Sequence, residues 1–272
     1  MKTSISNLGW NHENTSELIP KLKAVGIQGI EIAPTLIWPD FGNIQLSEVS
    51  EFAHKIKEEG ISVSGIQSLS FGRPELQVFD KSTWPKFREH LKKMFEVGGQ
   101  LGAGIAVFGS PKNRVKGELN ELEANHMALD FFASLIPNLI ENNIRLTLEP
   151  NARAYGADFL TNYKQVVYLS KEIGSAWIVP QIDTGCMWMS EDEVEESFSF
   201  HRPGHIHLSL PNLAAFPEDI DFKPFLHRVL QSDYSSWVVI EMLNKGNDEI
   251  KTVLSAAAAL QNLIKEIIDN DE

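Results

Sequence analysis

Four acidic or imidazole side chains stand at the ends of short apolar runs in the second half of the chain. They are Glu149 in LTLEP, Asp183 in QIDTG, His207 in HIHLS and Glu241 in VVIEM. Carboxylate oxygens together with one imidazole suit a divalent cation, namely Mn²⁺, Mg²⁺, Co²⁺ or Zn²⁺. Three carboxylates held close together would raise one another's pKa values, and a cation would remove that repulsion. If the fold brings the four run ends together, the pattern predicts a site for one divalent metal ion.

Each of these residues also has a simpler interpretation when it is taken alone. A carboxylate at a strand exit is often a helix cap, and Asp183 stands directly before Thr184 and Gly185, where a turn would suit it. A succession of four such run ends favours a shared site. Strand alternation sends His205 and His207 to the same face. His207 is nearer to the end of its run and is the predicted ligand, whereas His205 is predicted to lie one layer deeper.

The runs that must position these residues alternate with longer amphipathic segments. Eight runs of four to six residues, rich in Ile, Val or Leu, have the pattern of strands that are buried on both faces. They are Thr3–Leu8, Gly29–Ile32, Ser62–Gln67, Ile105–Phe108, Arg145–Leu148, Ile178–Ile182, His205–Leu208 and Trp237–Ile240. Helical patterns lie between them, one of them at 121–141, where Pro137 is predicted to cause a kink.

This alternation predicts the α/β class and a single (β/α)8 TIM barrel domain over residues 1–272, because no Pro/Ser-rich linker divides the chain. Active sites of such barrels form at the carboxyl ends of the strands, which is where the four candidate ligands fall. A doubly wound open sheet is the alternative. It lacks support, because no run is followed by a Gly-rich dinucleotide fingerprint or a Walker loop.

Composition limits the classes of partner. Hydrophobic residues make up 43% of the chain, which is ordinary for a globular protein, and the formal net charge is −13. This charge argues against nucleic acid or an anionic membrane as the main partner. Cys186 is the only cysteine, which excludes an intramolecular disulfide framework and a Cys-rich zinc site. No signal peptide or membrane-spanning run is apparent, so we expect a cytoplasmic protein.

The four motifs, in this order and spacing, resemble those of the xylose isomerase-like TIM barrel superfamily. KTSISNLGW, GIEIAP and VFGSPKNR are similar to its sugar phosphate isomerase/epimerase branch. The resemblance implies that Glu149, Asp183, His207 and Glu241 hold one metal ion. It also implies that Glu149 and Glu241 are catalytic, moving a proton between carbons of a small carbohydrate substrate through an enediolate that the metal stabilises. A homo-oligomer is compatible with this interpretation.

Further residues near the predicted strand ends are candidates for substrate binding. The rings of Trp10 and Trp188 would stack on a sugar face, with packing at the barrel rim as the alternative. Lys112, Arg114 and Arg153 would donate to an anionic group of the substrate, with a solvated loop as the alternative. Lys245 would complete such an anion site. Cys186 is predicted to line the pocket rather than to act as a nucleophile, since no activating histidine is adjacent in sequence.

Several positions depart from the resemblance. Cys186 stands where the family often has a histidine that contacts substrate, HLSLPNLAAFP contains no arginine, and ARAYG lacks a second glutamate. These departures concern substrate choice, so two alternatives stay open: an inosose-type dehydratase or hydroxypyruvate-type isomerase on the same scaffold, and a carbohydrate-binding barrel without turnover. Endonuclease IV is a weaker match, because VFGS and GIQS end without the extra histidines of its metal cluster.

Overall fold

The structure, a computed structural model, describes residues 1–190, 192, 194–216, 221–243, 246 and 248–271. Eight parallel strands form a closed barrel in which each strand pairs with its neighbours in sequence and β1 pairs with β8. The strands are β1 (Lys2–Ser6), β2 (Gly29–Ile32), β3 (Ser62–Ile66), β4 (Ile105–Phe108), β5 (Arg145–Leu148), β6 (Ile178–Asp183), β7 (His205–Ser209) and β8 (Trp237–Glu241). The predicted (β/α)8 TIM barrel is confirmed.

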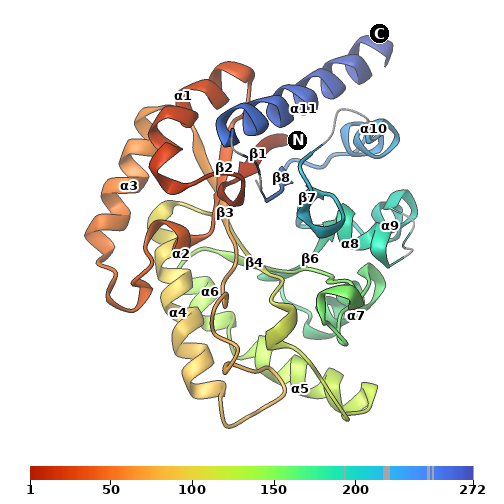
Figure 1. Cartoon of the computed structure of the whole chain (residues 1–272). Coiled ribbons are helices and arrows are strands. Elements are labelled where there is room, and N and C mark those ends of the chain that lie inside the picture. Colours follow the sequence, from red (N-terminus) through yellow and green to blue (C-terminus); the bar gives the residue numbers. More distant parts are fainter. Residues whose placement is uncertain (191, 193, 217–220, 244–245, 247, 272) are drawn as a thin grey trace.

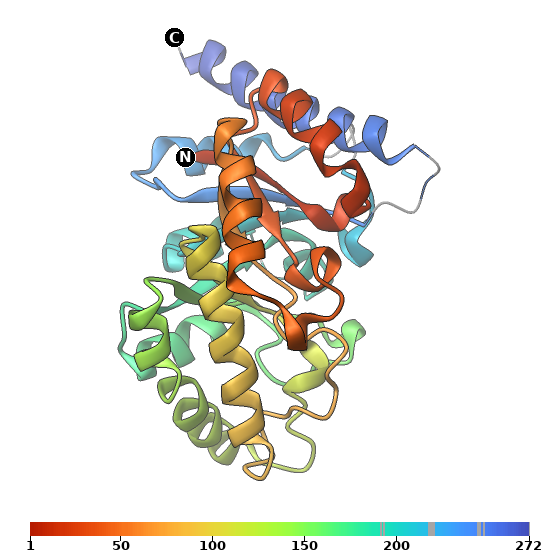
Figure 2. The same ribbon diagram turned by 90° about the vertical axis from the view of Figure 1, so that its left-hand side faces the viewer.

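Helices lie outside the strands and surround them (Figure 1). They are α1 (Thr15–Val25), α3 (Leu46–Glu58), α4 (Trp84–Leu101), α5 (Glu121–Ala133), α6 (Ile136–Glu141), α7 (Tyr163–Ile173), α9 (Val194–Phe200), α10 (Lys223–Gln231) and α11 (Glu249–Asp271). The short helices α2 (Pro34–Ile37) and α8 (Thr184–Met189) follow β2 and β6. Figure 2 shows α11 alongside α1, which closes the ring. Among the described helices, none combines the length and apolarity that a bilayer crossing needs.

Two expectations about element boundaries are corrected. The first strand ends at Ser6 rather than at Leu8, because residues 7–9 form a 3-10 turn in which the Ser6 hydroxyl accepts a hydrogen bond of 3.1 Å from the Leu8 N–H. The helical pattern at 121–141 is divided into α5 and α6 rather than kinked. Pro137 falls in the first turn of α6, where its missing N–H leaves no helical hydrogen bond unmade.

The apolar core lies between the strands and the helices, whereas the barrel interior is partly polar. Ile5 is fully buried in the core, and its neighbour Ser4 points to the other face of β1. The hydroxyls of Ser4 and Ser64 are 2.7 Å apart across the interior, and Thr147 donates to Oε1 of Gln181 at 2.6 Å. This internal hydrogen bonding supplies partners for several of the polar side chains that are buried inside the barrel.

Candidate active site

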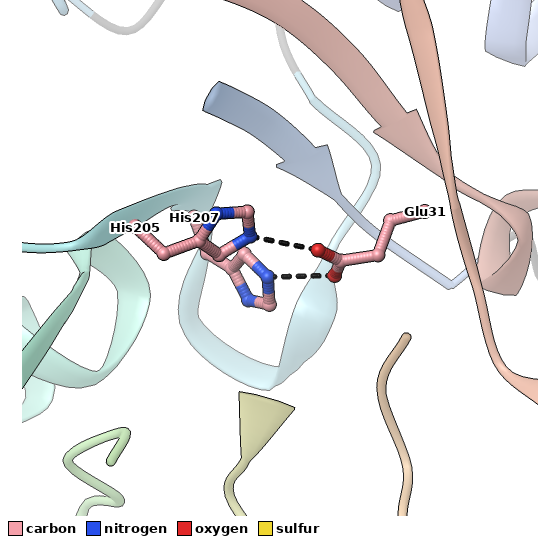
Figure 3. Close-up of side chains that lie close together, drawn as sticks. All are labelled: Glu31, His205 and His207. Atoms are coloured by element: carbon pink, nitrogen blue, oxygen red, sulfur yellow. Dashed lines mark hydrogen bonds and ion pairs between the residues drawn. The ribbon is translucent and has the colours of Figure 1, made fainter. Parts of the chain in front are cut away.

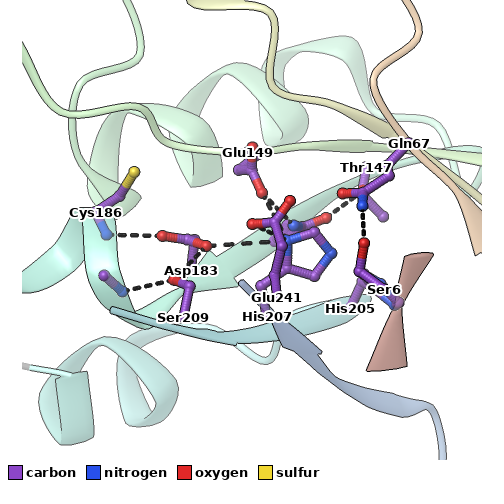
Figure 4. Close-up of polar contacts among 12 residues, drawn as sticks. Ser6, Gln67, Thr147, Glu149, Asp183, Cys186, His205, His207, Ser209 and Glu241 are labelled. Atoms are coloured by element: carbon purple, nitrogen blue, oxygen red, sulfur yellow. Dashed lines mark hydrogen bonds and ion pairs between the residues drawn. The ribbon is translucent and has the colours of Figure 1, made fainter. Parts of the chain in front are cut away.

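The four predicted ligands converge at one end of the barrel. Glu149 directly follows β5, Asp183 and Glu241 are the last residues of β6 and β8, and His207 lies in β7. One donor atom from each residue lies within 4.8 Å of the others, and Figure 4 shows the carboxylates around the imidazole ring. The His207 side chain is fully buried, and the three acidic residues are at most 8% exposed. The fold brings the predicted set together, and its binding of a metal ion stays a prediction.

The Nδ1 atom of His207 lies at the centre of this cluster. It is 3.0 Å from Oε1 of Glu149, 3.2 Å from Oε2 of Glu241 and 3.9 Å from Oδ2 of Asp183. Although these oxygens are close, none is aligned as a hydrogen-bond partner, and Nδ1 has no other partner among the described residues. A buried nitrogen that faces three carboxylates without a hydrogen bond fits a cation as the missing partner.

The other ring nitrogen of His207 is held by Glu31, a residue of β2 that was not among the predicted site residues. Oε1 of Glu31 is 2.8 Å from Nε2 of His207, and Oε2 is 2.7 Å from Nε2 of His205 (Figure 3). All three side chains are fully buried. An ionised carboxylate only accepts hydrogen bonds, so Nε2 of each ring carries the hydrogen. In a neutral His207 ring, the lone pair is then on Nδ1 and points towards the carboxylate cluster.

The pKa values of the clustered side chains are changed by burial and by the charges of neighbouring side chains. Burial raises the pKa of Asp183 to about 6 and that of Glu241 to about 7, and neighbouring carboxylates add to both increases. Burial alone would lower the pKa of His207, but the charges of Glu241 and Glu31 hold that pKa well above its usual value. Burial would raise the pKa of Glu31, yet the two histidines lower it to about 2. Protons and a divalent cation therefore compete for the same donor atoms.

Buried amides fix the direction of the Glu149 carboxylate. Gln181 donates from Nε2 to Oε1 of Glu149 at 2.7 Å, and its own Oε1 accepts from the hydroxyl of Thr147. On the other side, Asn151 donates from Nδ2 to Oε2 of Glu149 at 3.2 Å. The Oδ1 atom of Asn151 is buried and has no partner among the described residues. Both oxygens of Glu149 are thus oriented by the barrel interior and by the loop that follows β5.

Asp183 is fixed by the turn that joins β6 to α8. Its Oδ1 accepts from the main-chain N–H of Cys186 at 2.7 Å, and its Oδ2 accepts from the hydroxyl of Ser209 at 2.7 Å. The same hydroxyl accepts from the N–H of Gly185 at 2.9 Å. A Cβ at Gly185 would lie 2.7 Å from the carbonyl oxygen of Leu210. Only glycine lets the start of α8 approach β7 so closely, and this approach sets the position of Asp183.

Arg114 is buried against the main chain of Glu149 rather than exposed on a loop. Its side chain is fully buried, and Nη2 donates to the main-chain carbonyl of Glu149 at 2.7 Å. Nε and Nη1 have no hydrogen-bond partner among the described residues. Burial lowers the pKa of Arg114 to about 10, so the guanidinium remains charged at neutral pH. Its binding of an anionic substrate group stays a prediction, and the observed contact is with the backbone of a proposed ligand.

Cys186 stands beside the cluster as a buried thiol. Its side chain is 4% exposed, and Sγ is 4.0 Å from Nδ2 of Asn151. Burial raises the pKa of the Cys186 thiol, and nearby carboxylates raise it further. The thiol is therefore protonated at neutral pH, which disfavours a nucleophilic role and agrees with a residue that lines a pocket. Contact between Cys186 and a substrate stays a prediction.

The two tryptophans occupy different environments. Trp10 is 5% exposed, packs in the hydrophobic core, and donates from Nε1 to the hydroxyl of Thr15 at 3.0 Å. Trp188 is in α8, is 38% exposed, and has its ring centroid 5.3 Å from that of Phe222. Trp188 consequently offers apolar surface to a ligand, whereas the ring of Trp10 is occupied by core packing.

Two of the remaining basic candidates, Lys112 and Arg153, do not join the cluster. Lys112 and Arg153 are exposed, and neither forms an ion pair with the clustered carboxylates within the described part of the chain. Arg153 lies beside a cavity of about 340 Å³ that is also lined by Gln165 and Ser190. Lys245 lies outside the described residues. Binding of an anionic group by Lys112 or Arg153 stays a prediction.

Tyr155 is a further residue near the site that was not predicted. Its hydroxyl accepts from the main-chain N–H of Asn212 at 2.7 Å and so joins the loop after β5 to the loop after β7. Burial raises the pKa of Tyr155 to about 12, and the charges of Asp183 and Glu241 contribute. No sequence signal indicated Tyr155, because its partner is a backbone group 57 positions away.

Solved structures of other proteins share this fold. No curated protein matches the sequence. The apo form of 3-keto-D-glucoside 4-epimerase, YcjR, from E. coli is 18% identical with a TM-score of 0.74, covering 97% of this chain and 99% of that one. An L-ribulose 3-epimerase is 14% identical with a TM-score of 0.81, covering 100% and 97%. The IOLI protein with a bound zinc atom is 14% identical with a TM-score of 0.75, covering 98% and 99%. At these low identities, the TM-scores show a shared fold and nothing further.

A family assignment comes from the sequence itself. The family model described as xylose isomerase-like TIM barrel matches residues 19–264, which is most of the chain. The matched range includes the strand ends that carry the four clustered side chains. This chain belongs to the xylose isomerase-like TIM barrel family.

Proposed function

We propose that this protein is a metal-dependent isomerase or epimerase that acts on a sugar or a sugar derivative by proton transfer between Glu149 and Glu241. One observation carries the proposal: an oxygen of each carboxylate lies within 3.2 Å of the same atom, Nδ1 of His207, at the carboxyl end of a barrel. The likeness of the fold to that of sugar epimerases supports the same class of reaction.

Glu149, Asp183, His207 and Glu241 would hold one divalent cation through carboxylate oxygens and Nδ1. When bound, the cation supplies a Lewis acid that polarises the substrate carbonyl and stabilises the negative charge of an enediolate. The donor set is compatible with Mn²⁺, Mg²⁺, Co²⁺ and Zn²⁺. The zinc atom of the IOLI protein makes Zn²⁺ the first ion to test.

The two glutamates are suited to proton exchange with a carbon next to a carbonyl. Hydrogen bonds from Gln181 and Asn151 fix the direction in which Glu149 presents its oxygens. Glu241 presents Oε2 3.2 Å from the same Nδ1 atom of His207 and is the second carboxylate that would exchange a proton with the substrate. One glutamate removes the proton from carbon, and the other returns a proton. Return to the neighbouring carbon gives an isomer, and return to the same carbon from the opposite face gives an epimer.

Solvent deuterium exchange tests the proposal. The protein, loaded in turn with each of the four metals, is incubated in D₂O with free and phosphorylated ketoses, including D-psicose, L-ribulose and a 3-keto-glucoside. NMR and mass spectrometry then follow deuterium at carbons beside the carbonyl. We expect incorporation and product formation by the wild type. Glu149→Gln and Glu241→Gln should each lose product formation, while either variant still exchanges the proton that its remaining glutamate reaches.

Other outcomes would indicate a different function. Binding of sugars without any exchange would identify a carbohydrate-binding barrel. Loss of water from an inosose would identify a dehydratase. Product formation without deuterium incorporation would point to hydride transfer and would contradict the two-glutamate mechanism.

A further inference from the structure

Glu31, His205 and His207 form a group of three buried side chains next to the carboxylate cluster, and His207 belongs to both groups. We propose that Glu31 is a positioning residue that fixes the ring orientation and the tautomer of His207, so that Nδ1 alone faces the metal site. This inference rests on the proposed metal dependence. Nε2 is committed to Glu31 by a contact of 2.8 Å, and Nδ1 lies among Glu149, Asp183 and Glu241.

The fold provides for Glu31 in two ways. The ladder between β2 and β3 shifts its register at this point, because Ile30 pairs with Val63 but Glu31 pairs with Gly65, so the extra residue lies on β3 and Gly65 comes opposite Glu31. On β3, Gly65 leaves the space that the carboxylate fills, since a Cβ at Gly65 would lie 2.8 Å from Oε2 of Glu31. The fold therefore makes room for a carboxylate at this position. The register shift and the glycine opposite Glu31 both support a specific role for this side chain.

Direct hydrogen bonds account for the grouping of Glu31, His205 and His207 without a second metal ion. The oxygen–nitrogen distances of 2.7 and 2.8 Å are those of direct hydrogen bonds. All three side chains have zero exposure, so the group is sealed from solvent. A buried carboxylate is costly unless each of its oxygens is hydrogen-bonded. His205 meets this need at Oε2, and His207 meets it at Oε1.

Removal of the Glu31 carboxylate should therefore act on the metal site through His207. In Glu31→Gln, the amide group presents an N–H where an oxygen accepted a hydrogen bond. The ring that faces this N–H must then expose a lone pair at Nε2 and move its hydrogen to Nδ1. On His207 that hydrogen would occupy the direction of the metal. Loss of a carboxylate that orients a ligating histidine typically lowers metal affinity about 10–100-fold.

The wild-type protein tests the tautomer directly. Two-dimensional ¹H–¹⁵N spectra of the histidine side chains, recorded with Zn²⁺ bound, identify which nitrogen carries the hydrogen and which binds the metal. We expect a protonated Nε2 and a zinc-shifted Nδ1 for His207, and a protonated Nε2 without a zinc shift for His205. Zinc ligation through Nε2 of His207 would overturn the proposal, and this measurement needs no variant that could fail to fold.

Calorimetric titration with Zn²⁺ measures the effect on affinity. Glu31→Gln should bind Zn²⁺ about 10–100-fold more weakly than the wild type. Glu31→Asp, which keeps an acceptor on a shorter side chain, should recover part of the loss. Glu141→Gln makes the same chemical change at an exposed position on α6 and should bind as the wild type does. Circular dichroism of each variant confirms that it is folded before titration.

Wild-type affinity in a folded Glu31→Gln variant would refute the positioning role. Because both measurements use zinc alone, they do not depend on finding a substrate. A protein that binds zinc through Nδ1 but exchanges no deuterium with any ketose would refute the proposed reaction and leave the role of Glu31 intact. If the wild type isomerises a sugar but the Glu31→Gln variant keeps full zinc affinity, the role of Glu31 would be refuted and the proposed reaction would stand.

Discussion

Buried acids at the site make the pH dependence of stability a sensitive test of the metal centre. The pKa values of Asp183 and Glu241, about 6 and about 7, lie above their ordinary values of 3.8 and 4.5. The folded chain therefore binds more protons than the unfolded chain between about pH 4 and 7. The raised pKa of His207 acts in the same direction above its ordinary value of 6.5, whereas the lowered pKa of His205 opposes the trend below that value. Metal-free protein should lose stability as pH rises through this range.

The magnitude follows from the size of the pKa change. For Glu241, a rise from 4.5 to about 7 corresponds to roughly 3 kcal/mol of unfolding free energy that is lost once the pH exceeds both values. A change of 1 kcal/mol moves the melting temperature of a chain of this size by about 2–4 °C. The metal-free protein should therefore melt about 6–12 °C lower at pH 8 than at pH 5.

A bound cation should reverse this trend. Metal at about 100 times its Kd adds roughly 2.7 kcal/mol of stability. Because the metal displaces protons from its ligands, its affinity rises about tenfold per pH unit for each proton displaced. The stabilisation that the metal gives should thus be small at pH 5 and large at pH 8, and the two melting curves should diverge as pH rises.

Calorimetric melting of chelator-treated and Zn²⁺-saturated protein from pH 5 to 8 checks this expectation. The net charge of −13 also disfavours the folded state at high pH, so the double variant Asp183→Asn/Glu241→Gln is the control. It should show a flatter metal-free pH profile and little response to zinc. A metal-free wild type whose stability is constant or rises towards pH 8 would contradict the assigned pKa changes. A melting temperature that saturating Zn²⁺, Mn²⁺, Mg²⁺ and Co²⁺ all leave unchanged would contradict the metal site.

Three further expectations concern individual residues. Glu149→Gln and Glu241→Gln should each lower turnover by at least about 10²–10⁴-fold, and near-normal turnover in either variant would indicate a one-base mechanism. Gly65→Ala should lower the free energy of unfolding by about 1–3 kcal/mol, because the new Cβ would lie 2.8 Å from a carboxylate oxygen of Glu31. Chemical unfolding measures this loss, and Gly104→Ala is the matched control, since its Cβ would have no heavy atom within 4 Å. Cys186 should react with iodoacetamide at pH 8 far more slowly than in unfolded protein, and equal rates would show that the thiol is neither buried nor raised in pKa.

The carboxylate cluster was predictable because parallel strands impose a simple rule. In a closed barrel of parallel strands, the carboxyl ends of all strands meet at one rim, so the last residue of each run is placed by topology. Glu149, Asp183 and Glu241 needed no knowledge of side-chain packing. In the strand ladder, Asp183 lies opposite His207 and Glu241 lies opposite Ser209. Both acidic residues are therefore level with the last part of β7.

Contacts that depend on bulges and on backbone partners were not predictable. Glu31 lies within the buried run GIEI, and its partner His205 is 174 positions away, so no local pattern joins them. The register shift before Glu31 has no clear sequence signature. The burial of Arg114 was not predicted either: its guanidinium donates to the carbonyl of Glu149, a contact that neither substrate binding nor a solvated loop indicated. A long side chain near a strand end turns inward or outward according to packing, which residue type alone does not decide.

The pair of histidines in β7 has a single physical explanation in Glu31. Alternation places both rings on the interior face, and their centroids are 5.2 Å apart. Burial lowers the pKa of His205, so this ring donates a hydrogen bond to Glu31 without adding a charge. Glu31 is therefore satisfied at both oxygens while its negative charge remains available to His207. A ligating histidine whose far nitrogen is hydrogen-bonded to a carboxylate is the more basic ligand for a cation. The unit that we propose to support the metal site is thus a carboxylate shared by two imidazoles, and the histidine that faces the cluster is its outer member.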